Sequence, residues 1–305
     1  MKAIIILFFL TISVFTNLTP VFAQTGTSGF TLSPPFKEIE LKKEASQSSY
    51  FIEITNNTPS HQTLYLSVVD FGSLDESGGV AFLGTGPEIL ERKYSLAFWV
   101  SFEKDILEIE SGKSEKLKVT IMNKESLSPG GHYAAIVSAT KSPKEEGRNV
   151  SLNTAFSSLI FVKKTGGEIY RLDLVEKEIR SRWLDLPDKI SLRFQNSGNV
   201  HLVPRGTVII TDPRGKVISK GIINGESGII LPESFRLYQT VLERLSLPFL
   251  PGTYRLNIDY RYEGSENFVN NSLAFFSPGI GGIAALLIIL FAMFLIFIRI
   301  KKTCP

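Results

Sequence analysis

Residues 254–262 read YRLNIDYRY, and this stretch decides the fold class because apolar or aromatic side chains occupy every second position. Arginine, asparagine and aspartate fill the positions between them. Successive side chains of a β-strand point to opposite faces of the sheet, so a strict period of two predicts a strand with one buried face.

The same alternation recurs along the chain, at 50–54, 64–68, 117–121 and 190–194. Clusters of glycine, proline, asparagine and serine separate these stretches, at spacings typical of antiparallel β-sandwiches. No convincing long amphipathic helix occurs before residue 280, although 232–247 fits either a helix or a strand. The pattern therefore predicts an all-β protein.

A change of direction is predicted at Lys163–Gly167, where two glycines follow a strand-like stretch. Glycine adopts backbone conformations that other residues avoid, and a new alternating pattern begins at Ile169. We therefore expect one β-sandwich domain over residues 24–165 and a second over residues 166–276.

The two predicted domains share two features. A strand ends in an asparagine, at Asn56 and Asn196, and a Pro-Gly turn later leads into a tyrosine, at Tyr133 and Tyr254. In Ig-like sandwiches a tyrosine near the start of a late strand can donate a hydrogen bond to the turn before it. We expect both tyrosines to fix such corners. The features lie further apart in the first domain, which predicts an insertion over 72–86.

A second set of turn residues follows the asparagine of the second domain. Gly198 lies between asparagine-type residues and suits a left-handed turn, so Asn196, Gly198, Asn199 and His201 are predicted to form the corner after a strand. His132 and His201 lack acidic or histidine neighbours at the spacings of a metal site. We therefore expect both histidines to stabilise turns.

The first 23 residues have the pattern of a signal peptide. Lys2 precedes an apolar run, and Val21-Phe22-Ala23 offers the small-residue exit that a signal peptidase reads. The run is short for a membrane span, so we expect cleavage after Ala23.

The other end of the chain predicts a membrane anchor. Residues 280–298 contain no charge, and a helix of that length crosses a bilayer core. The basic tail, 299–305, places the C-terminus in the cytoplasm and the ectodomain outside the cell, as in a type I membrane protein. A sorting signal that is cut and replaced by a covalent anchor is the alternative, because Ser277-Pro278-Gly279 precedes the run.

Charge and cysteine content exclude several kinds of partner. The net charge of +3 comes from basic residues in the two end segments, so the ectodomain is close to neutral and gives no support to nucleic-acid binding. The only cysteine, Cys304, lies in the predicted cytoplasmic tail. The ectodomain therefore contains no disulfide, and its stability must come from a buried core.

Catalytic motifs are absent from the sequence. The chain has three histidines and contains neither HExxH nor GxSxG. We therefore expect no enzyme activity, no metal site and no cofactor.

Three residues are candidates for partner binding. Phe82 and Leu83 lie beside glycines in the predicted insertion, and binding residues are commonly carried on loops over a rigid scaffold. They could equally cover one end of the sandwich core. Trp183 has arginines, an aspartate and a proline nearby and could be an exposed anchor for a ligand, whereas Trp99 lies in an apolar stretch and is predicted to be buried.

Several segments together resemble the WxL-interacting surface proteins of bacteria. The resemblance rests on Leu32-Ser33-Pro34, Phe51 to Asn56, Trp99-Val100, Leu127 to Ala135, and Asn196 to Leu202 with the later Pro-Gly-Thr-Tyr. It covers most of the ectodomain and extends to the C-terminal helix. It implies two tandem immunoglobulin-like domains and a role in binding cell-wall material or partner surface proteins.

A second function stays open at this point. Pilus chaperones assemble envelope proteins by completing a partner's sheet with an edge strand, and Ser157–Val162 could serve as such a strand. Those chaperones are soluble, whereas this chain carries a predicted membrane span. We therefore favour a membrane-anchored binding or scaffold protein, with the envelope assembly factor as the alternative.

Overall fold

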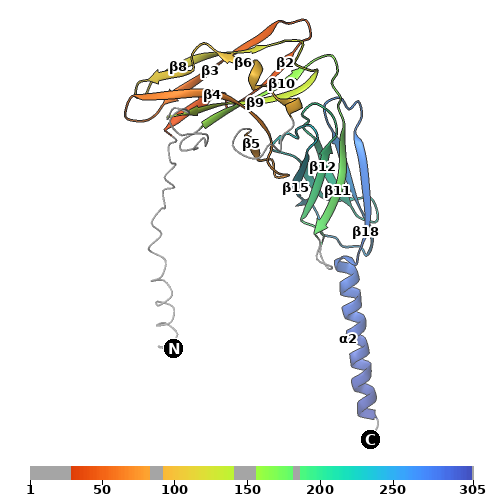
Figure 1. Ribbon diagram of the computed structural model, residues 1–305. Helices are drawn as coiled ribbons and strands as arrows, with labels where there is room; N and C mark the ends of the chain where they lie inside the picture. The colour runs from red at the N-terminus through yellow and green to blue at the C-terminus, as the bar shows by residue number, and fades with distance from the viewer. Residues whose placement is uncertain (1–28, 83–91, 141–155, 181–185, 304–305) are drawn as a thin grey trace, which may run out of the picture.

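The computed structural model describes residues 29–82, 92–140, 156–180 and 186–303; the predicted signal peptide and Cys304 lie outside the described residues. Two immunoglobulin-like β-sandwiches follow one another, and one long helix ends the chain (Figure 1). The first sandwich comprises β1 (Phe30–Ser33), β2 (Phe36–Leu41), β3 (Gln47–Asn56), β4 (Gln62–Ser73), β5 (Val80–Phe82), β6 (Val100–Phe102), β7 (Ile106–Ile109), β8 (Ser114–Met122), β9 (Gly130–Ala139) and β10 (Phe156–Lys164), with short 3-10 turns at Arg92–Tyr94 and Ala97–Trp99.

The remaining elements form the second sandwich and the helix. The strands are β11 (Leu172–Arg180), β12 (Lys189–Asn196), β13 (Arg205–Thr211), β14 (Val217–Ile223), β15 (Phe235–Val241), β16 (Glu243–Arg244), β17 (Gly252–Arg261) and β18 (Val269–Ser277), and the helix is α2 (Gly279–Thr303). The first sandwich lies across the upper end of the second, and α2 leaves the lower end (Figure 1).

The first sandwich pairs a sheet of order β1-β3-β8-β6 with a sheet of order β2-β10-β9-β4-β5, and β7 pairs with β4. The chain changes sheet at Pro34 and Pro35, so β1 is antiparallel to β3 whereas β2 is parallel to β10. Alternating residues of β3 and β8, among them Ile52, Ile54 and Leu117, fill the core between the sheets.

The second sandwich pairs a sheet of order β11-β12-β15 with a sheet of order β16-β14-β13-β17-β18. The stretch that predicted the fold is its strand β17, in which Tyr254, Leu256, Ile258 and Tyr260 are buried, as the alternation predicts. Tyr260 packs edge-on against Phe194 of β12, with ring centroids 4.9 Å apart, and so joins the two sheets.

The repeated asparagines make corresponding hydrogen bonds in both sandwiches. Asn56 and Asn196 are fully buried, and each side-chain amide donates to a carbonyl four residues later and to a second carbonyl distant in the sequence. Each side-chain oxygen accepts the backbone N–H two residues later. The acceptor carbonyls are those of Ser60 and Ile109 for Asn56, and of Val200 and Ile230 for Asn196.

The corner residue predicted in the first domain is wrong by one position. Tyr254 donates from its hydroxyl to Leu250 O over 2.7 Å, in the turn before β17, which is the predicted bond. In the first sandwich the corresponding bond, also 2.7 Å, joins His132 Nε2 to Ser128 O. His132 and Tyr254 are each the third residue after the proline of the turn, so Tyr133 points to the opposite face of its strand.

The corner bond of the second sandwich makes a stability prediction. We expect Tyr254→Phe to lower the free energy of unfolding by about 1 kcal/mol, because the part-buried Leu250 carbonyl loses its donor while the buried ring still fills its site. The measurement is urea denaturation of the full-length protein in detergent. Tyr262→Phe, a half-buried position just beyond β17, is the matched control. An equal decrease in the free energy of unfolding of both variants would contradict the stabilising role of the corner bond.

The buried corner histidine makes a pH prediction. Burial lowers the pKa of His132 below its usual value of 6.5, so the unfolded chain takes up the proton more readily than the folded one. Stability should therefore fall as the pH drops below about 6.5. We expect the urea midpoint to decrease between pH 7.5 and 5.5, and to decrease less in His132→Gln than in the wild type. If the exposed His61→Gln variant flattened the profile instead, the assignment to His132 would be wrong.

The helix α2 has the length and composition to cross a membrane over Gly279–Arg299. Its apolar side chains from Leu286 to Phe297 are exposed, because no other part of the described chain covers them. The predicted span, 280–298, lies within it.

Candidate functional site

One sheet of the first sandwich is apolar on both faces near the second domain. Along β9 every residue from Gly130 to Ser138 is buried. If one face of the sheet were exposed to solvent, every second residue of the strand would be exposed. Tyr133, Ala135 and Val137 point away from the core and gather with Phe71 of β4 and Phe161 of β10 in a separate apolar cluster.

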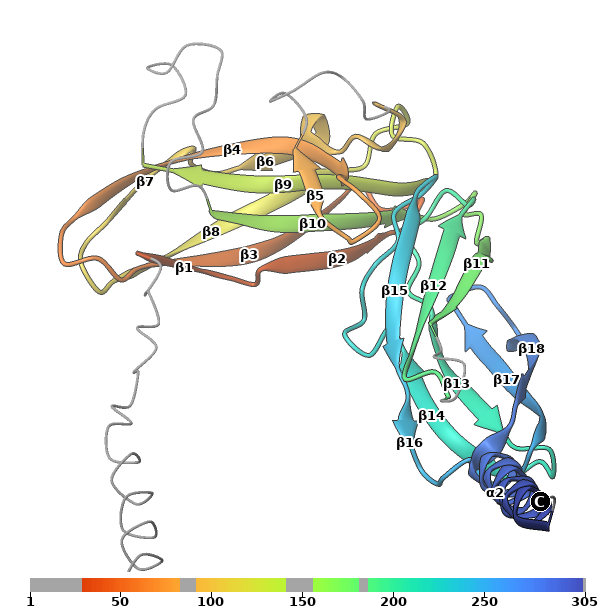
Figure 2. The same ribbon diagram turned by 90° about the horizontal axis from the view of Figure 1, so that it is seen from below.

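The second domain covers this cluster. Ile229 and Leu231, from the segment before β15, pack against it, as do Phe82 of β5 and Tyr94. The upper end of the second sandwich meets the ends of β9 and β10 in Figure 2. The cluster therefore belongs to the junction between the domains, and we call it the junction cluster.

A pocket of about 320 Å³ opens beside the junction cluster, between the two domains. Its walls are mostly apolar, with Asp75, Glu226 and Arg236 among the polar residues. The apolar lining residues are Phe36, Phe71, Val80, Leu159 and Phe161 from the first domain and Ile229, Ile230, Leu231 and Phe235 from the second. Phe36 is 56% exposed, so the pocket is open to solvent on the side of β2.

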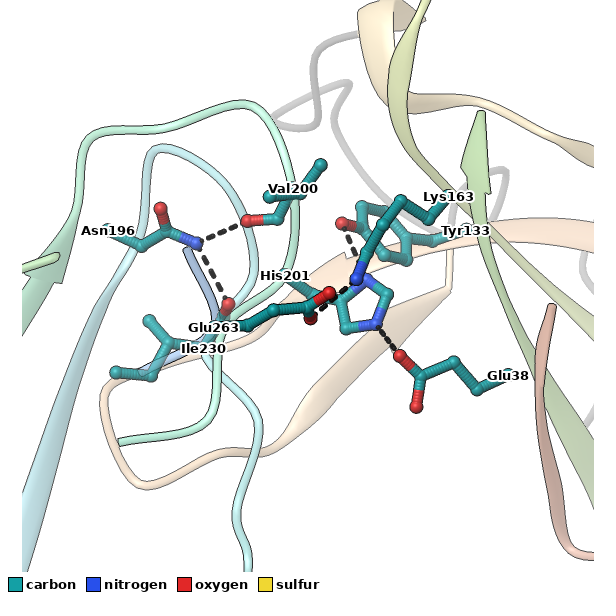
Figure 3. A network of polar contacts seen from close by, with 8 residues as sticks. All are labelled: Glu38, Tyr133, Lys163, Asn196, Val200, His201, Ile230 and Glu263. Atoms are coloured by element: carbon teal, nitrogen blue, oxygen red, sulfur yellow. Dashed lines mark hydrogen bonds and ion pairs between the residues drawn. The ribbon is translucent and has the colours of Figure 1, made fainter. Parts of the chain in front are cut away.

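A polar network fixes the angle between the domains on one side of the junction (Figure 3). His201 of the second domain is buried, and its Nε2 lies 2.8 Å from Glu38 Oε1 of β2 while its Nδ1 lies 3.3 Å from the Tyr133 hydroxyl. Burial raises the pKa of Tyr133, so its hydroxyl keeps its proton. The hydrogen bond from His201 lowers the pKa of Glu38, which keeps the carboxylate charged.

Backbone bonds tie the connecting segment to the same place. Gly131 N–H donates to Asn199 O over 2.7 Å, across the domain junction. The Asn199 side chain donates to Gly167 O over 2.9 Å and accepts from Ile169 N–H over 2.6 Å. The Glu168 carboxylate accepts from the N–H groups of both glycines in the connection. These bonds restrain the segment that the glycines alone would leave free to swing.

Gly198 is needed for a reason other than the predicted one. Its φ is not among the positive values of the described chain, so the left-handed turn predicted there is wrong. A Cβ at this position would lie 2.1 Å from Ile169 O, so glycine allows the close approach of two backbone segments. Asn196 holds this corner through its bonds to Gly198 and Val200. The side chains of Asn199 and His201, predicted to hold the same corner, bond instead to the connecting segment and to the first domain.

Ion pairs fix the domains at other points of the junction. Arg193 makes two bonds to the Glu76 carboxylate, of 2.7 and 2.6 Å, and Leu237 N–H donates to Glu76 O. Lys93 and the Tyr94 hydroxyl both contact Glu233 Oε1, at 2.6 and 2.7 Å. A further pair joins Lys163 Nζ to Glu263 Oε2 at 2.5 Å (Figure 3). The pocket is therefore bounded by two domains that hold each other in place.

The candidate binding residues named from the sequence lie apart from this pocket or outside the described residues. Phe82 is half-buried in β5, pairs with Phe71 and packs on the junction cluster, and the pocket lining does not include it. Leu83 and Trp183 lie outside the described residues. Trp99 is half-buried against the first core, next to Phe98, which is 86% exposed.

Sequence reasoning named Leu159 and Phe161 only as part of the candidate edge strand Ser157–Val162, and it missed the other pocket residues. A signal was present only for the junction cluster beside the pocket: the run Tyr133 to Val137 does not alternate, and an uninterrupted apolar run indicates a strand covered on both faces. Phe36 and Phe235 carry no local signal, because their importance depends on the other domain.

The described residues contain no group of three or more histidine, cysteine, aspartate or glutamate side chains that could hold a metal ion. The predicted edge strand Ser157–Val162 lies mostly inside its sheet, since β2 and β9 pair with β10 on both sides from Leu159 onward. Only Phe156–Ser158 pairs on one side alone.

No protein-family model matches the chain, and no curated protein matches it. Several solved structures of pilus chaperones are similar in fold. The class 5 fimbriae chaperone CfaA is 12% identical, with 81% of this chain and 98% of that chain covered and a TM-score of 0.41. The Escherichia coli chaperone DraB is 13% identical, with 81% and 95% covered and a TM-score of 0.34. At these identities and TM-scores the likeness assigns no function.

Proposed function

We propose that this protein is a membrane-tethered binding protein outside the cytoplasm, which holds an apolar segment of a partner surface protein in the pocket between its two domains. The observation that supports the proposal is the pocket itself: about 320 Å³, apolar, and walled by both domains of a junction held by polar bonds. Ligand pockets of proteins are commonly concave, apolar, preformed and located between domains.

The chemistry of the pocket favours a protein partner over a cell-wall polymer. Phe36, Leu159 and Phe235 offer an apolar surface that a leucine or phenylalanine side chain would fill. Sugars present many hydroxyls, which an apolar lining would leave without hydrogen bonds, at a cost in free energy. Large side chains that fill desolvated pockets, as a partner's phenylalanine would here, carry most of the binding energy in protein interfaces.

The position of the pocket in the chain supports a tethered role. The second sandwich stands between α2 and the first sandwich (Figure 1), and the pocket is lined by residues of both sandwiches. If α2 spans the membrane, the basic residues that follow it place both domains outside the cytoplasm. The pocket is then held one domain length above the membrane, where it can reach other envelope proteins. The resemblance to WxL-interacting proteins would imply the same class of partner, namely surface proteins.

A second candidate function is the envelope assembly factor that completes a partner's sheet. It is supported by Phe156–Ser158, where one side of β10 pairs with no strand in the described structure, just before Leu159 enters the pocket lining. A partner strand added there would place its side chains next to the pocket. The two functions therefore predict neighbouring but separable contacts.

Photo-crosslinking in native membranes tests both functions. A photoreactive side chain at Phe36 in the full-length protein should crosslink to a surface protein, and the same group at Phe51, an equally exposed phenylalanine on β3, should not. Crosslinks from Ser157 stronger than those from Phe36 favour the assembly factor. Crosslinks to glycan only, or equal yields at Phe36 and Phe51, would contradict the proposal.

A further inference from the structure

The first turn of α2 is bonded directly to the second sandwich. Ile280 N–H donates to Pro248 O over 2.7 Å, and Gly281 N–H donates to Phe249 O over 2.9 Å. The first four N–H groups of a helix have no partner within the helix, and these carbonyls accept from two of those of α2. The segment between β16 and β17 therefore works as a cap on the helix.

Close packing makes this junction stiff. Gly279 has φ +59°, and a Cβ there would lie 2.5 Å from Leu250 O. The ring of Phe249 lies against Gly281, where a Cβ would come within 3.2 Å of it. Leu250 O also accepts the corner bond from Tyr254, so the cap is held from the helix side and from the sandwich side.

Large apolar side chains are exposed at this end of the sandwich. Leu247 is 67% exposed, Phe249 65% and Phe276 73%, and we call these three residues the apolar foot. The β13–β14 turn lies at the same end, because a Cβ at Gly252 would meet Pro213 at 2.9 Å. That turn carries the exposed residues Arg214 and Lys216.

The length of α2 restricts where the apolar foot can lie relative to the bilayer surface. The uncharged stretch 280–298 is 19 residues long, or about 28 Å at the rise of an α-helix, against a hydrocarbon core of about 30 Å. Raising the helix would pull Arg299 into the hydrocarbon. If α2 spans the membrane, Ile280 and Gly281 lie at the boundary of the hydrocarbon, and Phe249, whose carbonyl accepts from Gly281 N–H, lies at the same level.

We infer that the apolar foot is a lipid-contacting surface, which inserts into the outer leaflet at the boundary between head groups and acyl chains. This inference rests on the proposed function in one respect, that α2 spans the membrane. Phenylalanine and leucine are side chains that insert at this depth, and Arg214 and Lys216 reach the phosphates of the head groups. Two attachments then hold the second sandwich, and the pocket stays at a constant height and angle.

Tryptophan quenching in liposomes tests this inference on the full-length protein. Trp99 and Trp183 are the only tryptophans, and replacing both with phenylalanine gives a background in which each introduced probe is alone. The probes are Leu247→Trp and Phe249→Trp in the foot, Phe291→Trp in the middle of α2, and Phe98→Trp, exposed on the first domain, as the distant control. The liposomes contain lipids brominated at a shallow or a deep position of the acyl chain, and each variant is first checked for cooperative melting.

We expect shallow bromines to quench both foot probes, deep bromines to quench Phe291→Trp, and neither to quench Phe98→Trp. Quenching of Phe291→Trp without quenching of the foot probes would overturn the foot and leave the membrane anchor intact. Absence of quenching at all four positions would overturn the anchor and the foot together. Equal quenching of Phe98→Trp and the foot probes would show that the sandwiches lie on the bilayer without a specific contact.

Discussion

Phe36→Asp should weaken capture of the partner at least tenfold while the domains still fold. Phe36 lines the pocket but is 56% exposed at the start of an edge strand, so its replacement removes little of the core. In the complex an aspartate would lie against an apolar partner and lose its hydration. An anchor residue of an interface is worth about 2 kcal/mol or more, and 1.4 kcal/mol already corresponds to a tenfold change in affinity.

The control for this prediction is Phe51→Asp on β3. Phe51 is 62% exposed and lies in the other sheet of the same sandwich, so the change in charge and surface is matched. Binding of the partner identified by crosslinking is measured on the full-length protein in detergent, together with the urea midpoint of each variant. Equal binding by both variants, or equal losses, would remove the pocket from the binding surface.

Asn196→Ala should destabilise the second sandwich by about 3 kcal/mol. The side chain makes three buried hydrogen bonds with the backbone, to Val200 O, Ile230 O and Gly198 N–H, and each group left without a partner costs about 1 kcal/mol or more. Asn57→Ala, which removes one exposed bond to Thr31, is the control and should change stability by less than about 0.5 kcal/mol. Urea denaturation gives both values.

A small effect of Asn196→Ala would mean that the corner relaxes and finds other partners. The corner also carries Asn199 and His201, which bond to the connecting segment and to Glu38. Asn196→Ala should therefore loosen the junction and weaken partner capture as well. Capture by a destabilised but otherwise unchanged variant would show that the pocket tolerates movement of this corner.

The strands could be predicted from the sequence because their signal is local. Alternation along residues 254–262 is a direct record of which side of β17 faces the core, and the buried Tyr254, Leu256 and Ile258 confirm it. The repeated asparagines were found for a similar reason, since a buried amide that closes a turn acts mainly on neighbouring residues. The same reasoning chose Tyr133 over His132 because it expected a tyrosine at the corner. A shift of one residue moves a side chain to the other face of the sheet.

The junction could not be predicted from the sequence. Tyr133 contacts His201, and Phe36 shares a pocket with Phe235. These partners lie far apart in the sequence, and the local alternation of side chains carries no information about such pairs. Phe36 reads locally as an exposed residue at the start of a strand. Its place in a pocket depends on the angle between two domains, which arises from the bonds of Glu38, Glu76 and their partners.

Hydrogen exchange of the full-length protein, alone and with the captured partner, tests the central claim most directly. If the partner segment occupies the pocket, amides should become protected in Phe156–Phe161 of β10 and over residues 226–236 of the second domain, and exchange in β3 and β8 should not change. Protection confined to β3 and β8, with unchanged exchange on both sides of the pocket, would contradict the account.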